Sequence, residues 1–235
     1  MPIEFLIFLT VFTPALVGGL NLIFNKNPNV RDTVTLLGAL ITFYFSANIF
    51  LGFDGQATQY KLATIMPGID ISFHIEPLGI IFSLLASGLW ILTHIYAIGY
   101  MRGAKEKNHS RFFFFFSVSI ASVMGISFSG NLFTLFLFYE ILTLITFPLV
   151  SHKGSTEALR GARVYLSILL GTSIGLQLLG IIWIYFSVGT LDFVKGGILN
   201  GSFGSFELIL LVGLFAFGIG KAALFPFHRW LPAAM

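Results

Sequence analysis

One apolar stretch of the sequence, residues 131–150 (NLFTLFLFYEILTLITFPLV), carries a single carboxylate near its midpoint, Glu140. Twenty mostly apolar residues are long enough to cross a bilayer as a helix. An ionisable group at the centre of such a helix costs about 2.5–3.5 kcal/mol on insertion scales. Helix formation does not require this carboxylate, so we expect Glu140 to handle protons. The alternative is a carboxylate satisfied by a structural ion pair.

A second apolar stretch, residues 208–225 (LILLVGLFAFGIGKAALF), contains Lys221 in a Gly-x-Gly-Lys sequence, and Pro226 follows five residues later. Glycines permit close helix approach or a local break, and a proline ends or kinks a helix. We therefore predict a helix that is broken near membrane depth, with Lys221 at the break as a group that loses and regains a proton. The alternative is a lysine whose side chain reaches the membrane interface.

The whole chain divides into apolar spans. With 56% hydrophobic and only 10% charged residues, against about 25% charged in soluble domains, it is expected to be an integral membrane protein. Seven spans can be marked, at residues 3–24, 33–53, 78–99, 112–129, 131–150, 161–186 and 207–225. The sequence therefore predicts an all-α membrane protein, a polytopic bundle of about seven transmembrane helices.

The charges in the connections predict the orientation. Ten of the thirteen Lys and Arg residues fall in connections on one side of the predicted bundle. Because basic connections stay in the cytoplasm, we expect the N-terminus outside and the C-terminus inside, in the inner (plasma) membrane of a bacterium.

Two stretches outside the candidate site carry further expectations. In residues 54–77, Ile69, Ile71, Phe73 and Ile75 alternate with polar residues, which predicts a short hairpin or an extended cover on the outer surface. The unbroken run Phe112–Phe116 is expected to face lipid.

Three further polar residues are candidates for the site. Arg163 opens the sixth span and could lie between Glu140 and Lys221, modulating both; the alternative is an interfacial anchor. His94, late in the third span, is either a satisfied core histidine or a proton relay. His228 lies beyond Pro226 and is either a relay or an interfacial residue.

Other kinds of site are not expected. The chain has no cysteine, and its five histidines lack metal-ligand spacing. There is no glycine-rich nucleotide motif and no nucleophile elbow. We therefore expect no metal, no cofactor and no nucleic-acid partner.

Three quoted segments resemble one family of membrane proteins: FLFYEILTLITFPLV around Glu140, GIGKAALFPFHRWLPAAM around Lys221, and IEPLGIIFSLLASGLWILTHIYAIGYMRG (75–103). They resemble the antiporter-like subunits of Mrp-type Na+/H+ antiporters, respiratory complex I and membrane-bound hydrogenases. The resemblance implies fourteen core helices in two inverted five-helix repeats, each with a broken helix. It also implies an acid–base pair of a glutamate on the fifth helix and a lysine on the seventh, roles that fall to Glu140 and Lys221.

The resemblance implies a domain organisation as well. Residues 1–110 correspond to an N-terminal three-helix segment with the outer extended loop 54–77, and residues 111–235 to a first, incomplete repeat truncated within the broken seventh helix. The chain then matches about the N-terminal half of a family member, as a split subunit or a fragment, and a C-terminal half is expected from elsewhere. Many relatives carry a lysine early in the sixth helix where this chain has Arg163.

The function implied is that of a proton-translocating subunit in a multisubunit cation/proton antiporter. Its partners would be the lipid bilayer, other membrane subunits, protons and, as candidate counter-ion, Na+. One alternative is an antiporter-like subunit of complex I (NADH-quinone oxidoreductase) or of a membrane-bound hydrogenase, so membership of an enzyme complex stays open. Others are a structural remnant that only scaffolds partners, and a retinal-binding seven-helix protein with Lys221 as Schiff-base lysine and Glu140 as counter-ion.

Overall fold

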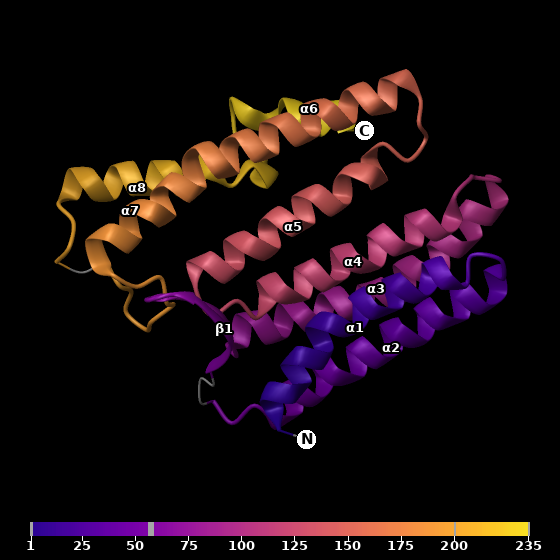
Figure 1. The fold of residues 1–235 in the computed structure, drawn as a ribbon, viewed down its shortest axis with the longest axis horizontal. Coiled ribbons are helices and arrows are strands. Elements are labelled where there is room, and N and C mark those ends of the chain that lie inside the picture. Colours follow the sequence, from indigo (N-terminus) through magenta and orange to yellow (C-terminus); the bar gives the residue numbers. More distant parts are fainter. Residues whose placement is uncertain (1, 56–58, 200, 235) are drawn as a thin grey trace. The chain divides into compact units, whose positions relative to one another are not determined.

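The computed structural model describes residues 2–55, 59–199 and 201–234, and these are mostly helical (Figure 1). The helices are α1 (Ile3–Ile23), α2 (Pro28–Gly52), α3 (Pro77–Gly103), α4 (His109–Ser127), α5 (Leu132–Val150), α6 (Thr156–Thr172), α7 (Leu178–Val188), α8 (Ser205–Gly218) and α9 (Trp230–Ala234). A π-helical turn, η1 (Ser173–Gln177), joins α6 to α7, and two 3-10 turns, η2 (Gly220–Ala222) and η3 (Phe227–Arg229), lie between α8 and α9.

Six helices in the described part of the chain are long and apolar enough to cross a membrane: α1 to α5, and the continuous helix from Thr156 to Val188. The seventh predicted span is α8, a shorter apolar helix of 14 residues. At 1.5 Å per residue it is about 21 Å long, less than the hydrocarbon thickness of about 30 Å. The all-α bundle and the broken seventh helix are therefore confirmed.

The chain forms two compact units. The first unit comprises Met1–Tyr60 and Phe73–Ser129, and the second comprises Lys61–Ser72 and Gly130–Met235. The helix α4 thus belongs with α1 to α3. The predicted boundary between residues 110 and 111 marks the start of a sequence repeat of the family, not the edge of a compact unit. It stays a prediction.

In the first unit, α1 packs against α2 and α4, and α3 also packs against α2 and α4. A Cβ atom at Gly79 of α3 would lie 2.1 Å from the Ser127 carbonyl oxygen, so only glycine allows this contact with the end of α4. The expectation that all of Phe112–Phe116 faces lipid is wrong for Phe113, which is fully buried. Five consecutive helical residues point all around the helix, so one of them must face inward.

The ends of two helices also differ from the expected spans. The predicted second span begins at residue 33, but α2 begins at Pro28, a residue favoured in the first helical turn, and buries Arg31 and Asp32. The predicted third span ends at residue 99, but α3 continues through Arg102. Charged residues were expected in connections, yet these three lie within helices because they pair with one another.

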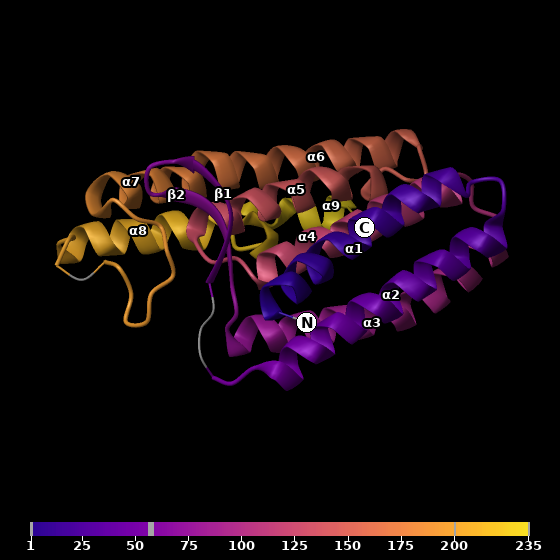
Figure 2. The same ribbon diagram turned by 60° about the horizontal axis from the view of Figure 1, so that its bottom comes forward.

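The predicted hairpin is formed by β1 (Gln59–Met66) and β2 (Ile69–His74); residues 56–58 of the loop lie outside the described residues. Within the second unit, its turn lies against the end of α7 (Figure 2), where the Tyr185 hydroxyl donates to the Pro67 carbonyl at 2.8 Å. The Asn131 side chain caps α5 by accepting from the Thr134 amide at 2.7 Å, and it donates to the Asp70 carbonyl. The hairpin thereby fixes the start of the helix that carries Glu140.

Candidate functional site

Lys221 lies in η2, directly after α8 ends, and its side chain reaches α5 of the same unit. The Lys221 ammonium donates to the Tyr139 carbonyl at 3.2 Å and also to the Thr143 hydroxyl. It lies 3.5 Å from the centre of the Tyr139 ring. The Lys221 backbone amide donates to the Tyr139 hydroxyl at 3.2 Å. Tyr139 therefore holds both the backbone and the side chain of the lysine.

The two α5 residues that receive the lysine are one helical turn apart, so they share a face. Both are buried, and the Thr143 hydroxyl also donates to the Tyr139 carbonyl at 2.9 Å. The face of an aromatic ring attracts a cation, more strongly when water is excluded. The ammonium is thus held by a carbonyl, a hydroxyl and a ring, all of them uncharged.

Glu140 is adjacent to Tyr139 in sequence and is half-buried. Its Oε1 is inaccessible to solvent and has no hydrogen-bond partner in the described part of the chain. Among the same residues, no ion pair joins Glu140 directly to Lys221. The lysine therefore contacts Tyr139, one residue before Glu140, and Thr143, three residues after it. The acid–base pair stays a prediction.

The break in the helix is held in place by close contacts with α6 and η1. A Cβ atom at Gly218 would lie 2.6 Å from the Gln177 amide nitrogen, and one at Gly220 would lie 2.3 Å from the Thr172 hydroxyl. The Gly220 carbonyl accepts from the Trp230 indole at 2.9 Å. These contacts position the turn that carries Lys221. A π-helical turn such as η1 is frequent at functional sites.

A second polar link connects α5, α6 and α9. The hydroxyls of Thr146 and Tyr165 are hydrogen-bonded at 2.5 Å, and the Tyr165 ring packs edge-on against Trp230 with centres 5.5 Å apart. The sequence analysis did not identify Tyr165, because a single tyrosine in an apolar span carries no signal of its own.

Two other candidates lie apart from the lysine. Arg163 on α6 and His228 on η3 are exposed, and neither has a hydrogen bond or ion pair to Glu140 or Lys221 in the ranges that the structure covers. His228 stacks on Phe225, with ring centres 5.7 Å apart. Their modulating and relay roles stay predictions.

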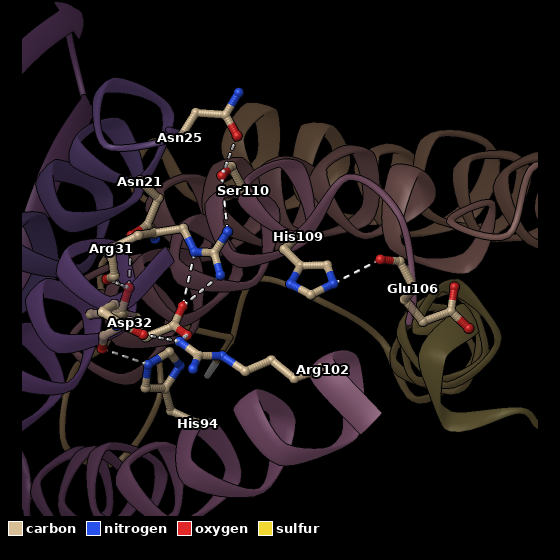
Figure 3. A network of polar contacts seen from close by, with 11 residues as sticks. Asn21, Asn25, Arg31, Asp32, His94, Arg102, Glu106, His109 and Ser110 are labelled. Carbon is tan, nitrogen blue, oxygen red and sulfur yellow. Dashed lines mark hydrogen bonds and ion pairs between the residues drawn. The ribbon is translucent and has the colours of Figure 1, made fainter. Parts of the chain in front are cut away.

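His94 belongs to the first unit, where it lies on α3 and is fully buried; Figure 3 shows it beside Asp32. Its Nε2 lies 3.0 Å from the Asp32 carbonyl oxygen, and its ring packs edge-on against Phe113. The other ring nitrogen, Nδ1, has no hydrogen-bond partner among the described residues. The relay role of His94 stays a prediction.

No three His, Asp or Glu side chains gather to hold a metal ion in residues 2–55, 59–199 and 201–234. The candidate site on α5 and η2 consists of one lysine, one carboxylate, a tyrosine and a threonine. The amine and the carboxyl can bind and release protons, and the two hydroxyls can donate and accept hydrogen bonds.

Comparisons with known proteins show which families the sequence resembles. Residues 129–235 match the family model described as NADH:quinone oxidoreductase/Mrp antiporter, TM. Residues 66–113 match the model described as NADH-Ubiquinone oxidoreductase (complex I), chain 5 N-terminus. The first match includes the whole candidate site.

Curated relatives come from both kinds of complex. The chain is 31% identical to NAD(P)H-quinone oxidoreductase subunit 5, chloroplastic, of Ipomoea purpurea, over 97% of this chain and 34% of the relative. It is 32% identical to the putative antiporter subunit mnhA2 of Staphylococcus haemolyticus, over 83% of this chain and 25% of the relative. The chain thus spans about a third or less of the length of these relatives.

Solved structures share the fold. The Mrp complex from Dietzia sp. DQ12-45-1b matches all of this chain and 44% of its own chain, with a TM-score of 0.81 and 22% identity. The membrane-bound sulfane sulfur reductase, an archaeal respiratory membrane complex, matches 96% of this chain and 35% of its own, also with a TM-score of 0.81 and 22% identity. The family models, the relatives and the shared fold agree with the resemblance in the sequence: this chain is an integral membrane protein that belongs to the family of antiporter-like subunits.

Proposed function

We propose that this chain is part of a proton-translocating subunit in a multisubunit cation/proton antiporter, with Lys221 as the proton-exchanging group and Glu140 as its acidic partner. The observation that carries the proposal is the position of Lys221. Its ammonium lies at the break of an apolar helix and is held by Tyr139 and Thr143, the neighbours of Glu140 on α5. A charged group in such a place is costly, and structural needs alone do not explain it.

The surroundings of the lysine suit proton exchange. The carbonyl and hydroxyl that accept from the ammonium can also accept from a neutral amine, whereas the attraction of the Tyr139 ring is specific to the cation. Both protonation states of Lys221 can therefore occupy the same place. The carboxyl of Glu140 follows Tyr139 directly on α5, and its Oε1 is inaccessible to solvent.

Electrostatic coupling between Glu140 and Lys221 lets the charge of one group shift the protonation equilibrium of the other. Two unit charges about 6 Å apart attract by about 3 kcal/mol at an effective dielectric constant of ~20. A change of this coupling by even half is equivalent to about tenfold in a protonation equilibrium. The turn that carries Lys221 offers a means of change, because η2 lies between two short helices and is followed by Ala223 with a φ of 51°.

The surroundings of the subunit follow from its relatives. The curated names describe subunits of antiporters and quinone oxidoreductases, so other membrane subunits are the expected partners here. The N-terminus is placed outside and the C-terminus in the cytoplasm of a bacterial cell, following the distribution of lysine and arginine.

The test is transport by the complete assembly in everted membrane vesicles, measured as the collapse of a pH gradient when Na+ is added. Glu140→Gln and Lys221→Ala are each expected to lower the rate at least about 100-fold without loss of the assembled complex. Matched controls are Glu157→Gln and Lys153→Ala, which remove the same groups at exposed positions of the same unit. Normal transport by both site variants would refute the proposal.

A second candidate function is a subunit of a proton-pumping quinone oxidoreductase, favoured by the relative that aligns with 97% of this chain. The same vesicles separate the two. An antiporter subunit exchanges Na+ for protons without any redox substrate. A subunit of an oxidoreductase supports proton pumping only while quinone is being reduced.

A further inference from the structure

A buried cluster in the first unit carries a surplus of positive charge. Asp32 accepts hydrogen bonds from two arginines (Figure 3). Arg31 Nε and Nη2 donate to Asp32 Oδ1 at 2.9 and 2.7 Å, and Arg102 Nη2 donates to Asp32 Oδ2 at 2.5 Å. One carboxylate therefore faces two guanidinium groups, and the cluster has a net charge of +1.

The two arginines differ in exposure. The side chain of Arg31 is 3% exposed and that of Asp32 is 6% exposed, whereas that of Arg102 is 44% exposed. Arg31 finds its remaining partners inside the unit, because its Nη1 donates to the Ser110 hydroxyl at 3.2 Å and its guanidinium lies over the Phe113 ring. The surplus charge is therefore presented to the outside by Arg102.

Arg102 lines a pocket of about 270 Å³ between α2 and α3. The residues around it are Asn29, Asp32, Thr33, Leu36, Ile98 and Arg102. The polar members lie at the start of α2 and the end of α3, while Leu36 and Ile98 lie about one turn further into each helix. The pocket is therefore polar toward the helix ends and apolar toward the membrane interior.

The apolar side continues along both helices. Leu40 follows Leu36 by four residues and is 45% exposed, and Ile95 precedes Ile98 by three residues and is 53% exposed. Residues three or four apart share one face of a helix. An uncovered apolar surface thus extends from the base of the pocket toward the middle of the membrane.

We propose that this pocket binds the headgroup of an anionic phospholipid, with its phosphate at Arg102 and an acyl chain along Leu40 and Ile95. A guanidinium matches phosphate with paired hydrogen bonds, and basic pockets between transmembrane helices bind anionic headgroups. A zwitterionic lipid is a weaker ligand, because its own cation meets the surplus positive charge. A free anion leaves the apolar surface uncovered.

The test compares phosphatidylglycerol with phosphatidylcholine of the same acyl chains, bound to the purified full protein and counted by native mass spectrometry. Arg102→Gln removes the phosphate-binding group. The matched control Lys107→Gln removes one exposed charge from the following connection without touching the pocket. Thr33→Trp fills the pocket from an exposed position and leaves the ion pair of Arg102 in place.

We expect wild-type protein to prefer phosphatidylglycerol at least about tenfold. Arg102→Gln and Thr33→Trp should each abolish this preference, and Thr33→Trp should keep the thermal unfolding midpoint of the wild type. Lys107→Gln should change the affinity at most about fivefold, which corresponds to the ~1 kcal/mol of one basic residue near a membrane surface.

Several results would overturn the proposal. Equal losses in Arg102→Gln and Lys107→Gln would show only diffuse surface charge. Full binding by Thr33→Trp would place the lipid elsewhere. Equal binding of phosphatidylcholine and phosphatidylglycerol would show that the pocket does not select an anionic headgroup. Displacement of the lipid by millimolar inorganic phosphate would indicate an ion site in which the acyl chain has no role.

Discussion

The Lys221 ammonium has two hydrogen-bond acceptors, the Tyr139 carbonyl and the Thr143 hydroxyl. Replacing Thr143 by valine removes the hydroxyl while keeping a similar side-chain shape. Thr143 is fully buried, so water does not readily take the place of its hydroxyl. A hydrogen bond to a charged group contributes about 1.5–3 kcal/mol. Since about 1.4 kcal/mol is a factor of ten, we expect Thr143→Val to slow proton transport by about 10- to 150-fold.

The reasoning predicts which variants keep activity. Thr143→Ser retains the hydroxyl and should stay within about threefold of the wild type. Thr146→Val serves as a matched control on the same helix, because its hydroxyl bonds to Tyr165 and not to the lysine. Transport is measured in vesicles from cells that make the complete assembly, at equal amounts of assembled protein.

Two results would refute this account of the lysine. The first is wild-type transport by Thr143→Val when Lys221→Ala is inactive, which would show that the hydroxyl contact does not matter to the exchange. The second is equal loss in Thr143→Ser and Thr143→Val, which would indicate that packing, rather than the hydrogen bond, is responsible.

Three further predictions concern stability. Gly218→Ala should cost about 1–3 kcal/mol in thermal unfolding, because its Cβ would lie 2.6 Å from a backbone nitrogen of η1, whereas Gly213→Ala, with nothing within 4 Å, should be neutral or slightly stabilising. The hydrogen bond from Lys61 holds the pKa of the Asp70 carboxyl below its ordinary 3.8. The hairpin should therefore be fully stabilised above about pH 4 and loosen as the pH falls through the lowered pKa. Hydrogen exchange of β1 and β2 should show this pH-dependent step, and Asp70→Asn should abolish it. Asp32→Asn leaves the buried Arg31 without its carboxylate and should cost about 3–5 kcal/mol in denaturant unfolding. An unchanged unfolding midpoint would contradict this prediction.

The positions of the membrane helices could be predicted from the sequence because crossing a bilayer imposes a length and a composition. The break after α8 was equally accessible, since Gly218, Gly220 and Pro226 each weaken a helix in a known way. Each of these signals lies within the segment that it describes. Local chemistry alone was therefore sufficient.

The charged cluster of the first unit could not be predicted in this way. Arg31, Asp32 and Arg102 were interpreted as connection residues because an isolated charge is excluded from a membrane helix. Arg102 and Asp32 are 70 residues apart, and only the packing of α2 against α3 brings them together. The apolar run at residues 112–116 was misjudged for the same reason, because which of its rings is buried depends on a neighbouring helix.

The partners of Lys221 show a related limit with a consequence for mechanism. Sequence reasoning pairs opposite charges, and so it joins Lys221 to Glu140. That pairing stays a prediction, and in the structure the hydrogen bonds of the ammonium go to the uncharged acceptors Tyr139 and Thr143. A direct buried ion pair would favour the charged lysine strongly and oppose release of its proton. Uncharged acceptors support the ammonium more weakly, so in the proposed exchange a modest change in the field of a nearby carboxylate would shift the balance between holding the proton and passing it on.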